Sequence, residues 1–335
     1  MATGVDGSPL MEKPLDAPSS GLVKRLAPPE SIMKPFQQAV FHLKTLYLFT
    51  KSDVKTVLAP QIIFILSAVL CREPLTTAGY GHGQTALDTA RRLPLAVFWI
   101  WLHLVVCGIS NQRLESSVVE DRLNKPWRPL AAGRLTAGQA QRLLLAAVPL
   151  AVAVSAALGG RELLPPTLAM TTLLWMYNDL DGSSIDVWAR NAINTAGIMC
   201  FGAGALTVLT GAALLPRAWA WIAVTGAATA TTVQALDFPD TDGDRARGRK
   251  TIPLLYGEHV ARGGLAVAVL VWSAACPMFW GLRPVFWAAP VGVGGSMAAL
   301  AVLRRNEKSD HVVAKLWCLW MSVLYLLPLF TAWGA

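Results

Sequence analysis

The sequence predicts an all-α integral membrane protein whose helices form one transmembrane bundle. Hydrophobic residues make up 54% of the 335 residues, and the mean hydropathy is +0.45. Charged residues make up only 15%, whereas soluble globular domains carry about 25%. Mostly apolar stretches recur along the chain, each near the roughly 20 helical residues that cross a hydrocarbon core.

Nine apolar stretches are candidate membrane spans. The fourth is short and carries Pro165 and Pro166, so its start is the least defined. Proline and glycine inside spans are tolerated where neighbouring helices satisfy the backbone. The small-residue run AGIMCFGAGALTVLTGAA in the fifth stretch permits close helix packing. The predicted spans are 56–72, 92–110, 137–158, 163–178, 191–214, 217–236, 260–281, 284–303 and 311–333.

The first 55 residues differ from the rest. Residues 1–34 are polar and proline-rich and lack the apolar core of a signal peptide. We expect a disordered tail there, followed by one transmembrane domain over 35–335. Residues 31–55 are expected to form an amphipathic helix on the membrane surface. Its apolar residues recur at near-helical spacing: Phe36, Val40, Leu43, Leu46 and Tyr47.

The distribution of positive charge predicts the orientation. The net charge is +8, but the basic residues lie between apolar spans, which argues against a nucleic-acid partner and leaves the lipid bilayer as the surroundings. Lys and Arg concentrate before the first span and after the second, fourth, sixth and eighth. The positive-inside rule makes these segments cytosolic. Nine spans without a cleavable signal fit the endoplasmic reticulum; the sequence identifies no protein partner.

The first polar segment, residues 111–129 (NQRLESSVVEDRLNKPWRP), directly follows the second span. Asn111 and Glu115 are four residues apart, which predicts one shared helical face. Further acids and bases follow at Glu120, Asp121, Lys125 and Arg128.

The second polar segment, residues 237–250 (DFPDTDGDRARGRK), follows the sixth span on the same predicted side of the membrane. Asp237, Asp240 and Asp244 share one face if a helix continues through Pro239, although proline can kink or end a helix.

Carboxylates clustered at the edge of the hydrocarbon repel one another and are poorly solvated. A divalent cation relieves both costs, and magnesium is commonly held by one or two carboxylates plus substrate phosphates. The two segments therefore predict Mg²⁺ bridging a diphosphate. Basic residues nearby would neutralise the remaining charge: Arg128, Arg134, Arg245, Arg249 and Lys250. The alternative is an ordinary solvated loop, and Glu120 and Asp242 are the members expected to be merely solvated.

The third polar segment, residues 177–191 (YNDLDGSSIDVWARN), joins spans four and five on the same side. Its polar residues form either a pocket wall inside the membrane or an ordinary turn with helix-capping residues. The candidates are Tyr177, Asn178, Asp179 and Asn191.

These motifs resemble the UbiA superfamily of intramembrane prenyltransferases, and in particular its fungal terpene cyclase branch. Residues at the offsets of the first family motif are Asn111, Glu115, Arg128 and Pro129, and those of the second are Asp240, Asp244, Lys250 and Thr251. The chain departs from the family at Gln112, Glu115 and Val119, where aspartate is usual. Asp121, which precedes NKPWRP, is the better counterpart of the shifted acid.

The resemblance implies a nine-helix bundle with a central cavity open to the cytosolic side. It implies magnesium-dependent ionisation of a C15 or C20 prenyl diphosphate, followed by cyclisation to a terpene hydrocarbon. An aromatic prenyltransferase is the alternative, and a non-enzymatic transporter or scaffold is a third. The implied catalytic residues are Asn111, Glu115, Asp240 and Asp244, with Asp121 and Asp237 as further metal ligands. The implied substrate-binding residues are Lys125, Arg128, Tyr177, Asn178, Asp179, Asn191, Arg249 and Lys250.

Overall fold

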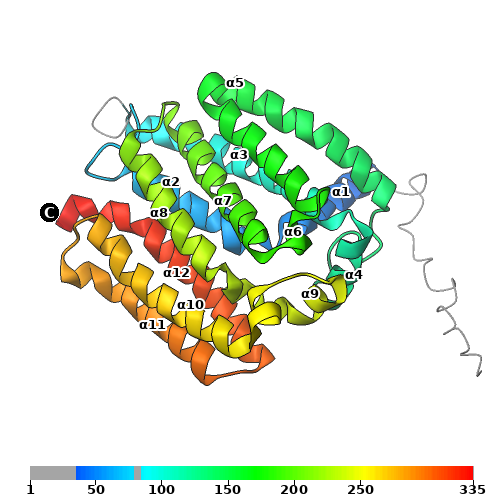
Figure 1. Ribbon diagram of the computed structural model, residues 1–335. Coiled ribbons are helices and arrows are strands. Elements are labelled where there is room, and N and C mark those ends of the chain that lie inside the picture. The colour runs from blue at the N-terminus through cyan, green and yellow to red at the C-terminus, as the bar shows by residue number, and fades with distance from the viewer. Residues whose placement is uncertain (1–34, 79–83, 335) are drawn as a thin grey trace, which may run out of the picture.

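The structure, a computed structural model, describes residues 35–78 and 84–334 as a helical bundle (Figure 1). The predicted disordered tail, 1–34, lies outside the described residues. The α-helices are α1 (Pro35–Thr50), α2 (Ala59–Val69), α3 (Ala86–Gln112), α4 (Glu115–Asn124), α5 (Ala137–Asn178), α6 (Gly182–Ile185), α7 (Val187–Thr210), α8 (Pro216–Thr232), α9 (Thr241–Arg247), α10 (Ile252–Phe279), α11 (Ala288–Leu303) and α12 (Glu307–Gly334). Short 3₁₀ or π segments are η2 (Val54–Leu58), η3 (Val233–Leu236), η4 (Phe238–Asp240) and η5 (Pro284–Trp287).

Helix is present over all or most of each predicted span, which supports a multi-pass membrane protein. Within the described ranges, six helices are long and apolar enough to cross a membrane, or up to seven if α1 and the helix 54–69, bent by 59°, count as one span. The nine-span count is therefore not confirmed. Two predicted spans merge in α5, and α2 and α8 are only 11 and 17 residues long.

Helix α5 is sharply kinked between the third and fourth predicted spans. Gly160 adopts φ 48° and ψ −122°, a conformation that glycine tolerates and other residues avoid. In Figure 1 the two halves run back along each other, and the Thr167 hydroxyl donates a 2.8 Å hydrogen bond to Ser155 across them. The chain therefore reverses direction near Gly160, and α5 consists of two helical halves that lie side by side.

Buried tryptophans join neighbouring helices through their indole N–H groups. A buried indole N–H needs an acceptor, and each of these donates to a hydroxyl on another segment at 2.9 Å. The pairs are Trp99 with Ser155, Trp317 with Thr232, and Trp320 with Ser273. These bonds link α3 to α5 and α12 to α8 and α10.

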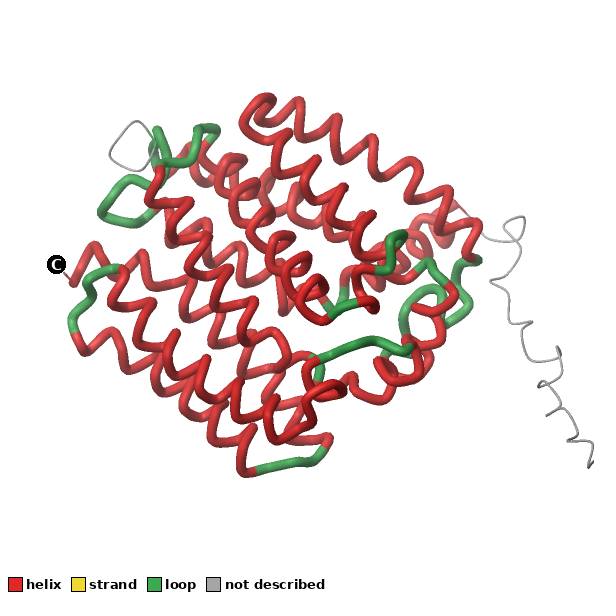
Figure 2. The backbone as a smooth tube through the Cα atoms, in the orientation of Figure 1, coloured by secondary structure: helices red, strands yellow, loops and turns green. Residues whose placement is uncertain are grey.

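The loops gather at the two ends of the bundle (Figure 2). At one end, α3 and α5 finish and α7, α10 and α12 begin, and the short helices α4, α6 and α9 lie across this end (Figure 1). Helix α4 packs against α9. All three polar segments thus meet at one end of the bundle, as the loop order of the sequence predicts.

We expect Gly204→Ala to destabilise the protein. A Cβ at Gly204 would lie 2.1 Å from the ring of the fully buried Trp99, and overpacking of this kind costs about 1–3 kcal/mol. The measurement is the Tm in detergent. The matched control is Gly292→Ala on the exposed side of α11, where a Cβ meets nothing within 4 Å and alanine favours the helix. Equal Tm values for the two variants would contradict this packing.

Candidate active site

A cavity of about 280 Å³ lies between α3, α5, α7 and the segment 233–240. The lining positions on each helix are three or four residues apart, so one face of each helix turns towards the cavity. They are Leu104, Cys107 and Asn111 on α3; Met170, Leu173, Leu174 and Tyr177 on α5; and Arg190, Ile193, Asn194, Gly197, Ile198 and Phe201 on α7. Asp53, Thr56, Val57, Val233, Leu236, Asp237, Asp240 and Trp317 complete the lining.

The cavity is polar at one end and apolar along its length. Asn111 and Tyr177 lie in the last turns of their helices, and Arg190 lies in the first turn of α7. With Asp237 and Asp240 they form what we call the polar mouth. The positions further along α3, α5 and α7 are almost all apolar, because these helices cross the bundle interior there. The site can therefore hold an anionic group at the mouth and a hydrocarbon chain behind it.

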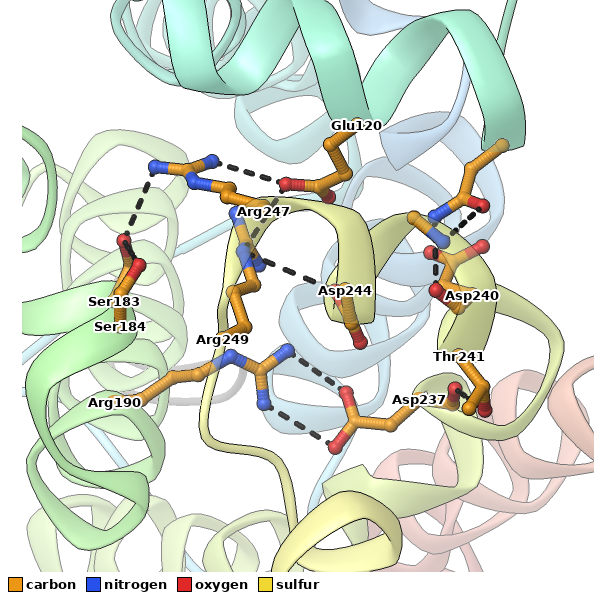
Figure 3. Close-up of polar contacts among 12 residues, drawn as sticks. Glu120, Ser183, Ser184, Arg190, Asp237, Asp240, Thr241, Asp244, Arg247 and Arg249 are labelled. Atoms are coloured by element: carbon orange, nitrogen blue, oxygen red, sulfur yellow. Dashed lines mark hydrogen bonds and ion pairs between the residues drawn. The ribbon is translucent and has the colours of Figure 1, made fainter. Parts of the chain in front are cut away.

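Arg190 and Asp237 form a two-bond ion pair at the mouth (Figure 3). The Arg190 Nη atoms donate to the two Asp237 carboxylate oxygens at 2.8 and 3.2 Å, and the side chains are only 8% and 3% exposed. Such fork-to-carboxylate contacts are strong and fix orientation. The sequence analysis identified Asp237 as a metal ligand, whereas Arg190 entered as a member of the third polar segment and as a charge that orients the bundle, without a role in the site. The signal available was an arginine within the first turn of an apolar helix, where charge is costly.

Asp240 joins the first polar segment to the second. Lys125 Nζ contacts its carboxylate, and the Asn124 amide donates to its backbone carbonyl at 2.9 Å. The Gly243 N–H in turn donates to Asn124 Oδ1 at 3.1 Å. A Cβ at Gly243 would lie 2.2 Å from the Asn124 amide nitrogen, so only glycine allows this approach.

Glu120 is buried, which corrects the expectation that it is merely solvated. Arg247 and Arg249 each lie 3.1 Å from its carboxylate, and Arg247 also donates to Ser183 Oγ at 3.3 Å (Figure 3). The fold brings α4, α6 and α9 together here, and a periodicity argument does not detect that contact. Asp242 is 87% exposed and pairs with Arg245, as expected of a solvated acid.

Asp244 lies behind the mouth, buried and 3.8 Å from Arg249. Burial, together with the nearby charge of Asp237, raises the pKa of the Asp244 carboxyl to about 7. Its Oδ2 atom has no hydrogen-bond partner among the described residues. A buried carboxylate oxygen without a partner is a free acceptor for a cation or a donor group.

Asp121 is buried beside Arg128, with 2.6 Å between the carboxylate and Nη1. Burial raises the pKa of Asp121, and the Arg128 charge opposes that shift. Neither residue lines the cavity. The pair holds the end of α4 against the loop that follows it.

The third polar segment forms part of the cavity wall, although its members differ in position. Asn178 donates to Asn111 Oδ1 at 2.9 Å and to Ser110 at 3.1 Å, which orients the Asn111 amide at the mouth. Asp179 pairs with Arg113. Asn191 is buried, and neither amide atom has a hydrogen-bond partner in the described part of the chain.

The prediction that Asn111 and Glu115 share one helical face is wrong, and the condition on which Asp237, Asp240 and Asp244 would share a face is not met. Helix α3 ends at Gln112 and α4 begins at Glu115, so Asn111 and Glu115 do not lie on one helix, and Glu115 is exposed. The second polar segment does not form one helix: Asp237 precedes η4, Asp240 ends η4 and Asp244 lies in α9. Pro239 lies in η4, a short 3₁₀ turn, which accounts for that break. Lys250 is exposed beyond the end of α9.

A comparison with protein families identifies the family of the chain. The model of the UbiA prenyltransferase family matches residues 74–324. The chain belongs to the UbiA prenyltransferase family. The resemblance to that family is thereby confirmed.

Two relatives indicate the range of chemistry in this part of the UbiA family. The chain is 31% identical over 293 residues to fumagillin beta-trans-bergamotene synthase of Aspergillus fumigatus, covering 86% of this chain and 92% of that protein. It is 28% identical over 295 residues to a polyprenyl transferase of Hericium erinaceus, covering 83% and 91%.

A solved structure confirms the UbiA fold. A UbiA homolog from Archaeoglobus fulgidus bound to GPP and Mg²⁺ superposes with a TM-score of 0.58 over 85% of this chain and 99% of that chain. The sequence identity is 13%, so the likeness concerns the fold alone.

The donor atoms at the mouth fit magnesium that enters with a diphosphate. Over residues 35–78 and 84–334, no three His, Cys, Asp or Glu side chains gather closely enough to hold a metal by themselves. Magnesium often takes only one or two carboxylates and completes its shell with phosphates and water. Asp237, Asp240 and Asn111 offer oxygen ligands on the cavity, and Asp244 has an unused oxygen behind it. Asp53, which the sequence analysis missed, adds a carboxylate from the bend before η2.

We expect Arg190→Met to destabilise the UbiA-family protein by about 3–5 kcal/mol, because it leaves the Asp237 carboxylate buried without its partner. The measurement is unfolding in detergent micelles. The control is Arg245→Met, whose ion pair with Asp242 is exposed, and we expect a change within about 0.5 kcal/mol. Similar losses of stability in both variants would mean that the buried Arg190–Asp237 pair stabilises the protein no more than the exposed Arg245–Asp242 pair does.

Proposed function

We propose that this protein ionises a C15 or C20 prenyl diphosphate with the help of Mg²⁺ and cyclises the chain to a terpene hydrocarbon, releasing diphosphate. The observation that carries the proposal is one cavity in which the charged and polar mouth continues directly into an apolar interior. A prenyl diphosphate has the same two parts in the same order. The likeness to a bergamotene synthase supports cyclisation as the outcome.

The mouth residues divide into metal ligands and diphosphate ligands. Asn111, Asp237 and Asp240 would hold magnesium, with Asp244 as the acid behind them. Bound magnesium supplies Lewis-acid stabilisation of the departing diphosphate. Lys125 and Arg190 lie against these carboxylates and carry the positive charge that a diphosphate requires. The residues around the mouth that we assign to binding or orienting the same group are Glu115, Asp121, Arg128, Tyr177, Asn178, Asp179, Asn191, Arg249 and Lys250.

The proposed reaction breaks the C–O bond between the prenyl chain and the diphosphate. The electron pair leaves with the diphosphate. The positive charges of Lys125 and Arg190 stabilise the negative charge that develops on it. The allylic cation that remains is attacked by a double bond of the same chain, which forms a C–C bond. Loss of one proton to the diphosphate then yields a neutral hydrocarbon. Atoms and charge balance without an oxidant or a second substrate.

The apolar walls protect the cation. Water would add to it, and the side chains of Leu104, Met170 and Ile198 exclude water from the interior. Phe201 and Trp317 line the same space, and an aromatic face attracts a cation through its ring quadrupole. These residues guide the chain without reacting with it.

We further propose that nine spans place the mouth on the cytosolic side of the endoplasmic reticulum membrane. Lys and Arg are concentrated in the segments at the mouth end of the bundle, which supports this orientation. The kink in α5 supports two spans within that helix.

Transfer of the prenyl group to an aromatic acceptor is the second candidate. The likeness to a polyprenyl transferase favours it, and ionisation at the mouth would be the same. The two reactions differ in what attacks the allylic cation: a double bond of the same prenyl chain in cyclisation, and the aromatic acceptor in prenyl transfer.

The test supplies membranes containing the protein with magnesium and C10, C15 or C20 prenyl diphosphate, without an acceptor. We expect a cyclic terpene in the hexane extract. Asp240→Ala should reduce the product by at least 100-fold, about 2.7 kcal/mol of transition-state stabilisation, because it removes a mouth carboxylate and the partner of Lys125. Removal of magnesium with a chelator should have a similar effect.

The control for this test is Asp242→Ala, which removes an exposed acid of the same polar segment and should leave the yield unchanged within about twofold. No hydrocarbon from any diphosphate, but prenylated product once aromatic acceptors are added, would replace the cyclase with the transferase.

A further inference from the structure

Helix α7 forms one complete wall of the cavity, from the mouth to its inner end. Arg190 holds Asp237 at the mouth, and Phe201 is the last α7 residue that lines the cavity. Eleven residues separate them, which corresponds to about 16 Å along a helix. A hydrocarbon chain whose head group lies at the mouth must therefore extend along α7 towards Phe201.

Gly197 is the one α7 lining residue without a side chain. A Cβ built there meets nothing within 4 Å, so the space beside it is open cavity. Glycine inside a helix costs about 0.8–1.0 kcal/mol relative to alanine. Packing between helices does not account for this cost at position 197.

The other glycines of the α7 interior have a packing reason. A Cβ at Gly202 would lie 3.3 Å from the Phe64 ring, and one at Gly204 would lie 2.1 Å from the Trp99 ring. Both glycines let a neighbouring aromatic side chain pack against the α7 backbone. Gly197 differs because the volume that it leaves free belongs to the cavity.

Bulky side chains line the cavity at the positions furthest from the mouth along α3, α5 and α7. Phe201, Met170 and Leu104 line it, and the Trp99 ring lies against Phe201 with 6.3 Å between the ring centroids. Trp99 is itself held by its hydrogen bond to Ser155. Trp99 therefore supports the Phe201 side of the cavity from behind, and position 197 lies along α7 between Phe201 and the mouth.

We infer that Gly197 determines which prenyl chain lengths the cavity accepts. The inference rests on the proposed function. The prenyl chain passes Gly197 and ends against Phe201. A side chain at position 197 would block that passage. Gly197 is therefore a specificity-determining position and not a catalytic residue.

The experiment compares wild type, Gly197→Ala and Gly197→Leu with C10, C15 and C20 prenyl diphosphates. Two readouts are taken on the purified protein: the rise in Tm that each diphosphate causes with magnesium, and kcat/KM for hydrocarbon formation. The matched control is Gly292→Leu on α11, which makes the same change where a Cβ also meets nothing within 4 Å, outside the cavity.

We expect Gly197→Leu to lower kcat/KM for C20 relative to C10 by at least tenfold and to shrink the Tm shift with C20 most. Gly197→Ala should shift the preference in the same direction by a smaller factor, and it provides the test if the leucine variant does not fold. Gly292→Leu should keep the wild-type preference within about twofold.

The same dependence on chain length in Gly197→Leu, Gly197→Ala and wild type would overturn the inference and leave the proposed function intact. Binding of prenyl diphosphates without turnover would overturn the proposed function, while the Tm shifts would still decide the role of Gly197. A wild-type protein that no prenyl diphosphate stabilises would overturn both.

Discussion

A buried carboxylate needs a positive partner, and at the polar mouth these partners come from distant parts of the chain. The resulting contacts connect α4, α7 and α9 with the segment 237–240 and with the residues that follow α9. The pairs are Asp237 with Arg190, Asp240 with Lys125, and Glu120 with Arg247 and Arg249. Removing either member of the buried Arg190–Asp237 or Glu120–Arg247 pair leaves a charge in a poorly solvated place, whereas the Lys125–Asp240 pair is partly exposed. The arrangement of the mouth is thus a consequence of charge compensation.

Some buried polar atoms near these ion pairs have no hydrogen-bond partner. The Asp244 Oδ2 atom and both amide atoms of Asn191 are buried without hydrogen-bond partners in the described ranges. Native proteins keep few such atoms, and those at a cavity commonly have a functional reason. Paired charges at the mouth thus have unused polar atoms near them in the chain, on Asp244 and Asn191, whereas the interior between Gly197 and Phe201 offers space and apolar surface.

Hydropathy and the order of charged loops were sufficient to predict a helical membrane bundle with its polar segments at one end, because both signals are local. The helix break before Glu115 was not predicted, since helical spacing says nothing about where tertiary contacts end a helix, whereas the break at Pro239 was one of two stated alternatives because proline can end a helix. The burial of Glu120 depends on arginines more than a hundred residues away. Arg190 and Asp53 lie outside the two acidic clusters, and only the fold shows that they line the same cavity.

The contact between the first and second polar segments has a consequence for biosynthesis. Glu120 and its partner Arg247 are 127 residues apart in the chain. At a translation rate of about 5–20 residues per second, the ribosome needs roughly 6–25 s to make the arginine after the glutamate. During that interval Glu120 has no arginine partner, although Asp121 of the same helix can already pair with Arg128, and Gly243 is not yet present to donate to Asn124. The mouth can therefore assemble only late, after most of the bundle has been inserted.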